Sequence, residues 1–203
     1  CGSPWTLAAY SIEGRSSKDF EKTLSFLESN QEDVHDLLTK YTDACFLYLR
    51  KQVQSGADVI QIFDSWANLL TKEDLIEYSF NYINSLISAL KLDPITKNIP
   101  VIIFARNPKC NIEELINTSA DCISLFWSMN NLNFEVAKNK VAIQGNLDPK
   151  ILLESDETIK RETYKILERF KEYPGYIFNL GHGITPDISP DKIKYLTNIV
   201  REY

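Results

Sequence analysis

His182 lies between two glycines, and this Gly181-His182-Gly183 tripeptide is the pattern in the chain best suited to chemistry. Glycine adopts backbone geometries that other residues disfavour, so we expect the two glycines to let the chain turn sharply and present the imidazole without crowding. An imidazole titrates near neutral pH and can move a proton or bind an anion. A turn residue or a satisfied core histidine is the alternative, and the paired glycines favour a functional role.

Two acidic positions have simpler interpretations. Asp64 and Ser65 follow an apolar run, and by default such residues cap the next helix. Asp148-Pro149 is typical of a turn followed by a helix start. Tyr10 is one of 10 tyrosines, so its residue type alone indicates no role.

The sequence lacks the patterns of several enzyme classes. It contains no GxGxxG after a strand, no GxxxxGK[ST], no HExxH and no GxSxG. With 2 histidines and 4 cysteines that lack CxxC spacing, we expect no zinc site. We interpret the cysteines as free thiols in a reducing cytosol, and they are Cys1, Cys45, Cys110 and Cys122.

Composition excludes further partners. The 203 residues include 22 Lys plus Arg and 28 Asp plus Glu, giving a net charge of −6, with no cationic patch for nucleic acid or an anionic membrane surface. The apolar runs have strand length, far short of the roughly 20 residues that span a bilayer. We therefore expect a cytoplasmic globular protein with no nucleic-acid or membrane partner. The chain opens at Cys1 without Met, which suggests a cut into a larger protein.

Short β-rich runs alternate with amphipathic helical stretches. Nearly continuous apolar runs predict strands covered on both faces, at 58–63, 100–105, 121–126, 140–144 and 175–180. Periodicity and capping patterns predict helices beginning near 16–19 and covering 31–54, 71–92, 156–170 and 190–203, with shorter pieces after Asn111 and Asn133.

This alternation predicts one α/β domain with a parallel sheet. Five strands, plus one that Cys1-Gly2 would end, fit either a doubly wound sheet or part of a (β/α)8 barrel. In both, the site lies at the carboxyl ends of the strands. The segments there are Cys1 to Tyr10, Asp64-Ser65-Trp66, Arg106-Asn107, Trp127, Gly145-Asn146-Leu147-Asp148 and Gly181-His182-Gly183.

Taken together, these strand-end peptides resemble the uroporphyrinogen decarboxylase family from the first residue to the last. The segment from Gly2 to Lys18 is similar to the family's G-A-P-W-T-L-x-x-Y-x-I-E-G-x-x-S-K signature. Gln61-Ile-Phe-Asp-Ser-Trp66 resembles its Q-x-F-D-S-W segment, and Gln144-Gly-Asn-Leu-Asp-Pro149 and Asn179-Leu-Gly-His-Gly-Ile184 match its last two strand ends. Four such peptides in order are highly specific.

The resemblance implies a cytoplasmic, homodimeric (β/α)8 barrel without cofactor. Its activity would remove CO2 from the four acetate side chains of uroporphyrinogen III to give coproporphyrinogen III. The substrate-contacting residues carry over as Tyr10, Ser65 and His182, with Tyr10 and His182 also as catalytic candidates. For His182 we favour substrate binding and orientation over proton transfer.

The chemistry explains what such a site needs. A pyrrole acetate loses CO2 readily only when the adjacent ring carbon is first protonated, so the protein must place acids and stabilise a cation. Arginines suit the eight carboxylates of the substrate. The family's M-R-Q-A-G-R-Y segment and an early strand-end aspartate are absent from these residues, and Phe126 stands where Asp is usual. We therefore expect the 203-residue chain alone to be inactive or nearly so, and Phe126 to alter local hydrogen bonding.

Two alternatives stay open. A related group of corrinoid-dependent methyltransferases holds zinc through H-x-C on one strand end and a late Cys, but Phe104-Ala-Arg106 and Gly181-His-Gly183 stand at those places. A non-catalytic, tetrapyrrole-binding fragment is the other. The resemblance also changes how we interpret the length of the chain. It implies that residues 1–203 form a single domain, which is the last six of eight barrel units with the N-terminal units missing.

Overall fold

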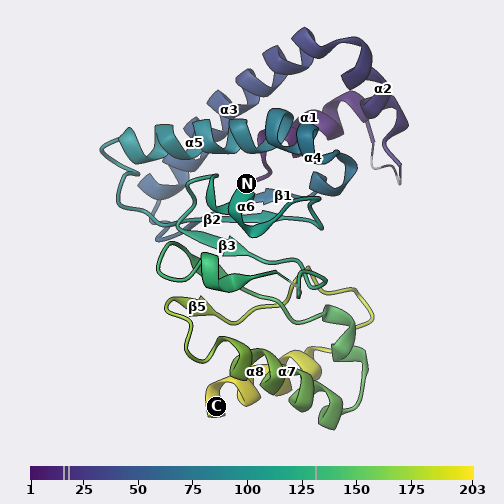
Figure 1. Ribbon diagram of the computed structural model, residues 1–203, viewed down its shortest axis with the longest axis vertical. Helices are drawn as coiled ribbons and strands as arrows, with labels where there is room; N and C mark the ends of the chain where they lie inside the picture. The colour runs from purple at the N-terminus through teal and green to yellow at the C-terminus, as the bar shows by residue number, and fades with distance from the viewer. Residues whose placement is uncertain (16, 18, 131) are drawn as a thin grey trace. The chain divides into compact units, whose positions relative to one another are not determined.

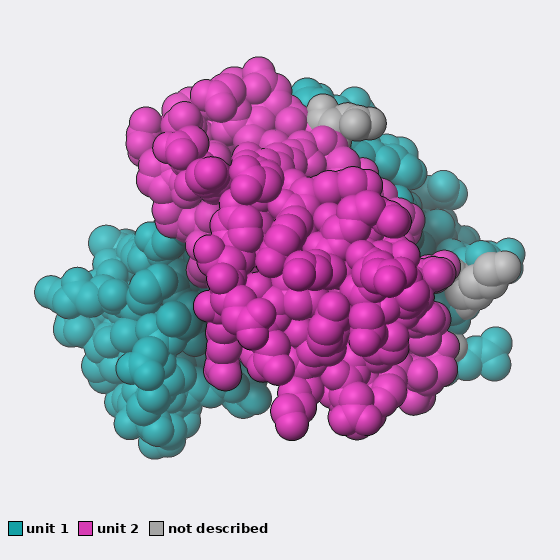
Figure 2. Space-filling model, turned by 90° about the horizontal axis from the view of Figure 1, so that it is seen from below, with its two compact units in different colours: residues 1–123 teal, residues 124–203 magenta. Residues whose placement is uncertain are grey.

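The structure, a computed structural model, describes residues 1–15, 17, 19–130 and 132–203 (Figure 1). The helix start predicted at 16–19 and the last part of the N-terminal signature include Ser16 and Lys18, which lie outside the described residues. The chain divides into two compact units, Cys1–Ile123 and Ser124–Tyr203, which Figure 2 colours separately. Each unit is described by itself below.

The sheet is parallel, with strand order β1-β2-β3-β4-β5. Each predicted strand is present but shorter than its apolar run. The strands are β1 (Ile60–Asp64), β2 (Val101–Ala105), β3 (Cys122–Ser124), β4 (Ala142–Gln144) and β5 (Tyr176–Ile177). The division between the units falls within β3. The expected α/β class with a parallel sheet is therefore confirmed.

In the first unit, β1 and β2 pair in parallel with Asp64 opposite Ala105. Gly2 forms a parallel bridge with Phe63, and the backbone N–H of Phe63 donates to the carbonyl of Cys1 at 2.8 Å. This pairing is expected if Cys1-Gly2 ends a strand. Because all five residues of β2 are buried, its continuous apolar sequence follows from coverage on both faces.

Helices α1 (Pro4–Glu13), α3 (Gln31–Gln54) and α5 (Asn81–Leu92) pack against one another in the first unit (Figure 1). The bounds of α3 are those that periodicity predicts. The predicted 71–92 helix is interrupted by a π-helical stretch. The remaining helices of this unit are α2 (Glu21–Ser29), η1 (Ala67–Leu69), α4 (Lys72–Asp74), η2 (Leu75–Phe80) and α6 (Ile112–Ile116).

Helix α1 is an element that the apolar patterning did not predict. The sequence nevertheless contains the capping signals for the start of this helix. The Ser3 hydroxyl accepts a hydrogen bond from the N–H of Thr6 at 3.0 Å, and Pro4 occupies the first turn. Gly14 ends it in the left-handed region at φ 76°, where its N–H reaches the carbonyl of Tyr10. Tyr10 therefore lies on a helix whose two ends are capped, rather than in a loop.

In the second unit, β4 and β5 pair in parallel and two amphipathic helices, α7 (Asp156–Phe170) and α8 (Pro190–Glu202), bury their apolar faces. Two short 3-10 helices complete it, η3 (Phe134–Val136) and η4 (Pro149–Leu153). One apolar cluster holds these elements together, formed by Leu147, Leu152, Ile159, Ile188, Leu196 and Ile199. Among the helices that the structure describes, none is long and apolar enough to cross a membrane.

Candidate functional site

Asp64, at the end of β1, is buried and accepts hydrogen bonds from three hydroxyl groups. Ser3 and Thr6 of the α1 start donate to Oδ1 at 2.9 and 3.1 Å, and Ser79 donates to Oδ2 at 2.5 Å. Burial raises the pKa of the carboxyl, and the three hydroxyl groups oppose that shift. The default interpretation of Asp64 as a helix cap is therefore wrong, because its oxygens serve two distant segments instead.

This hydroxyl network also fixes the next residue. The backbone N–H of Ser65 donates to the Thr6 hydroxyl at 2.9 Å, and that hydroxyl in turn donates to Asp64. Within the described residues, the Ser65 hydroxyl itself makes no hydrogen bond and the residue is half-buried. The position of Ser65 beside α1 is thus determined, and its side-chain hydroxyl remains available to donate a hydrogen bond.

Tyr10 lies in the same neighbourhood as Ser65, because both flank Trp66. The Tyr10 and Trp66 rings meet edge to face with centroids 5.8 Å apart, and Phe20 packs on Trp66 at 4.3 Å. Tyr10 is 41% exposed, and its hydroxyl has no hydrogen-bond partner in the described part of the chain. Trp5 donates its indole N–H to the carbonyl of Trp66 at 3.1 Å. The first unit therefore brings together two of the predicted site residues on a rigid aromatic support.

His182 belongs to the second unit, where it is exposed after β5. Its ring meets the edge of Phe126 with centroids 5.9 Å apart and planes at 87°, and its Nδ1 lies 3.3 Å from the carbonyl of Gly183. An aromatic ring therefore packs on the imidazole, at a position where the resemblance implies a carboxylate. The amide of Asn146 donates to the carbonyl of Phe126 at 3.1 Å.

The glycines around His182 differ in what they do. A Cβ on Gly181 would lie 2.4 Å from the backbone nitrogen of Trp127 and 2.5 Å from its Cα, so the chain there passes too close for any side chain. A Cβ on Gly183 would meet nothing within 4 Å. Neither glycine has a left-handed φ, yet the chain bends at Gly181 and His182, as the tripeptide predicts. Gly181 is required for close approach to Trp127 in addition.

Asp148 caps a helix, as its pairing with proline predicts. Its carboxylate accepts the N–H of Lys150 at 3.0 Å, and Pro149 begins η4. The four cysteines are free, as expected from their spacing. Burial raises the pKa of the Cys110 and Cys122 thiols to about 12. Within residues 1–15, 17, 19–130 and 132–203, no group of three or more His, Cys, Asp or Glu side chains could hold a metal ion.

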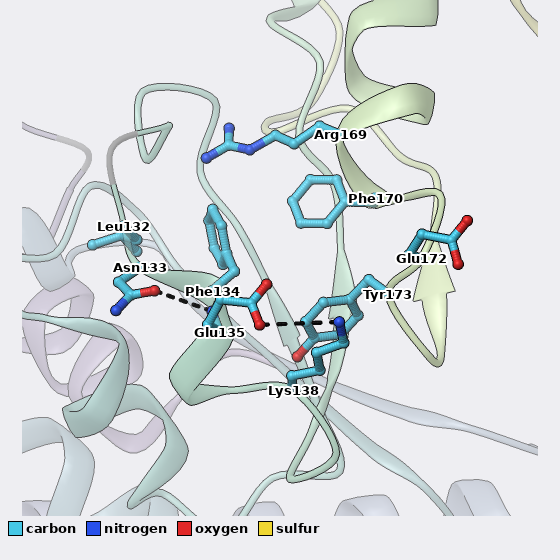
Figure 3. A pocket seen from close by; sticks show the side chains of 9 residues that line it. All are labelled: Leu132, Asn133, Phe134, Glu135, Lys138, Arg169, Phe170, Glu172 and Tyr173. Atoms are coloured by element: carbon cyan, nitrogen blue, oxygen red, sulfur yellow. Dashed lines mark hydrogen bonds and ion pairs between the residues drawn. The ribbon is translucent and has the colours of Figure 1, made fainter.

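A separate cavity of about 250 Å³ lies in the second unit between η3 and the end of α7 (Figure 3). Arg169 covers the ring of Phe134 there, with its guanidinium carbon 4.7 Å from the ring centroid. Arg169 also donates to the side-chain oxygen of Asn130 at 3.2 Å. The lining includes none of the predicted site residues, so this cavity is not the expected site.

In α/β proteins with parallel sheets, ligands bind at the carboxyl ends of the strands, and Ser65 and His182 follow β1 and β5. The family model described as uroporphyrinogen decarboxylase (URO-D) matches residues 1–203. The chain belongs to this family.

Named relatives agree with this membership. The chain is 39% identical over 204 residues to the uroporphyrinogen decarboxylase of Ruthia magnifica subsp. Calyptogena magnifica, covering 100% of this chain and 58% of that protein. It is 40% identical over 202 residues to the enzyme of that name from Aquifex aeolicus, covering 100% and 59%. It is 41% identical over 204 residues to that from a Hydrogenobaculum species, covering 100% and 58%. The chain thus spans a little under three fifths of the relatives' length.

Proposed function

We propose that this chain carries the strand-end residues of a uroporphyrinogen decarboxylase, an enzyme of haem and tetrapyrrole biosynthesis. The observation that carries the proposal is the family match over all 203 residues, which includes the four strand-end peptides. The placement of two open hydroxyl groups around one aromatic support, at Tyr10 and Ser65, agrees with a ligand that combines rings and carboxylates.

The reaction replaces a carboxylate by a proton. Protonation of the pyrrole carbon beside an acetate makes a cationic ring that accepts the electron pair of the breaking carbon–carboxylate bond. CO2 leaves, and a second protonation step at the exocyclic carbon with loss of the ring proton gives a methyl group. Four repeats turn eight carboxylates into four. Each acetate must be held with its carboxylate out of the ring plane, which is a task for fixed hydrogen-bond donors.

The residues have different parts in this proposal. Tyr10 and Ser65 donate hydrogen bonds to substrate carboxylates, because both hydroxyl groups are open and both are positioned by rigid neighbours. His182 binds and orients the substrate, and proton transfer is its secondary role. Asp64 is a positioning residue. It accepts a hydrogen bond from the Thr6 hydroxyl, and that hydroxyl accepts one from the backbone N–H of Ser65.

Cation stabilisation and most carboxylate binding require groups that these 203 residues lack. The arginine-rich segment and the early strand-end aspartate that the resemblance implies are absent from the sequence. We therefore propose that the chain alone binds porphyrins better than it decarboxylates uroporphyrinogen. The same resemblance leads us to propose a single (β/α)8 domain of which these residues are the C-terminal part, a homodimer, and a cytoplasmic location.

The test uses the protein that carries this chain, expressed at its natural length. Incubated with uroporphyrinogen III under anaerobic conditions, it should yield porphyrinogens with seven, six, five and finally four carboxylates, which chromatography of the oxidised products separates. Binding of uroporphyrin without any loss of carboxylates would favour the non-catalytic alternative. Absence of both binding and product would overturn the proposal.

A further inference from the structure

Arg106 is a cation at the carboxyl end of β2, beside Ser65. Its backbone N–H donates to the carbonyl of Asp64 at 3.0 Å, and Asp64 pairs with Ala105 in the sheet register. The hydrogen bonds of the backbone therefore place Arg106 next to the end of β1, on the same sheet edge as Ser65.

The guanidinium of Arg106 lies over Trp66, with its central carbon 5.4 Å from the ring centroid. The same indole contacts the ring of Tyr10 at 5.8 Å, and its backbone follows Ser65 directly. One aromatic side chain thus supports a cation and lies beside two open hydroxyl groups. All of these residues belong to the first unit.

Arg106 is half-buried, yet no described carboxylate forms an ion pair with it and no described acceptor takes a hydrogen bond from its guanidinium. Arg50 is different, because it pairs with Asp93 at 2.9 Å. A guanidinium has five N–H donors in a planar fork that fits a carboxylate, and stacking on an indole leaves the edge of that fork unused. The contact with Trp66 holds the cation in place without satisfying it.

We propose that Arg106 binds a carboxylate of the tetrapyrrole substrate, together with the hydroxyl groups of Tyr10 and Ser65. This inference rests on the proposed function and names a residue beyond those that the resemblance supplies. The chemistry that it recognises is a carboxylate attached to a flat ring, since the cation, the donors and the aromatic face lie together.

The test is a titration of the protein at its natural length with uroporphyrin, the stable oxidised form of the substrate, followed by quenching of tryptophan fluorescence. Arg106→Gln removes the cation and should weaken binding about tenfold, because a charge-assisted pair is lost. Arg106→Lys keeps the charge without the planar fork and should fall between Arg106→Gln and the wild type. Arg201→Gln, at an exposed arginine of α8, is the matched control for net charge and should bind as the wild type does.

The possible results separate the two proposals. If the wild type and Arg201→Gln bind uroporphyrin and Arg106→Gln binds equally well, this inference is overturned and the proposed function stands. If none of the proteins binds, the proposed function fails and this inference fails with it. Circular dichroism checks each variant, and Arg106→Met, whose apolar stem still packs on Trp66, decides the question if Arg106→Gln does not fold.

Discussion

The hydroxyl of Ser79 donates a 2.5 Å hydrogen bond to Oδ2 of Asp64, fifteen residues earlier in the chain. Both side chains are buried, with 0% and 1% exposure. A buried carboxylate is stable only when hydrogen bonds replace the water that it has lost. Because Ser3 and Thr6 satisfy the other oxygen, the π-helical stretch around Ser79 and the start of α1 are both tied to the end of β1.

Ser79→Ala should destabilise the protein by about 1–3 kcal/mol, because one oxygen of the buried Asp64 loses its donor. The matched control is Ser85→Ala on the exposed side of α5, whose hydroxyl bonds only to a carbonyl of its own helix, and it should cost less than about 0.5 kcal/mol. Urea unfolding measures both. Equal midpoints for the two variants would show that the Asp64 network contributes nothing to stability.

The two glycines around His182 should differ sharply in their tolerance of alanine. Gly181→Ala places a methyl group against the backbone of Trp127 and should cost about 1–3 kcal/mol or more, since neither segment can move freely. Gly183→Ala should be nearly neutral, because the space around it is open. Thermal unfolding of the pair measures this difference. A neutral Gly181→Ala would contradict the close approach.

His182→Asn should lower kcat/KM for uroporphyrinogen at least about tenfold in the protein at its natural length, because a donor to the substrate is repositioned or lost. His35→Asn is the control, since His35 is the other of the 2 histidines and lies on helix α3, where it stacks on Tyr78, rather than at the end of a strand. Turnover and affinity are measured for both variants. If His182→Asn changes neither quantity, His182 has neither a binding nor a proton-transfer role.

The sequence predicted much of this structure, and the failures have physical causes. Strands such as β2 and helices such as α3 follow from apolar patterning because burial repeats along them. The role of Asp64 could not be read from spacing, because its hydroxyl donors come from positions 61, 58 and 15 residues away. Likewise, the reason for Gly181 lies in the backbone of Trp127, which no local pattern reveals.

The thiols of Cys110 and Cys122 should react slowly with iodoacetamide in the folded protein. Burial raises the pKa of both thiols from an ordinary value of 9.0 to about 12, so the thiolate is scarce at pH 8. The rate should rise about tenfold for each unit between pH 7 and pH 10, whereas in the urea-unfolded chain it should level off near pH 9. Mass spectrometry of timed samples measures the labelling.

The same shifts predict how stability depends on pH. Each thiol has a higher pKa in the folded chain than in the unfolded chain, so the folded state retains the proton longer. This contribution to stability is complete below about pH 9 and is lost as the pH rises towards 12. Rapid labelling of both thiols at pH 7 without unfolding would contradict their burial.

Recognition of substrate carboxylates by Tyr10 and Ser65 is the central claim, and steady-state kinetics of Tyr10→Phe and Ser65→Ala test it most directly. In the natural-length protein, each variant should raise KM for uroporphyrinogen roughly tenfold, because one hydrogen bond to a charged group is lost. Tyr48→Phe, at an exposed tyrosine of α3, is the control and should leave KM unchanged. Wild-type KM and kcat in both site variants would contradict the account.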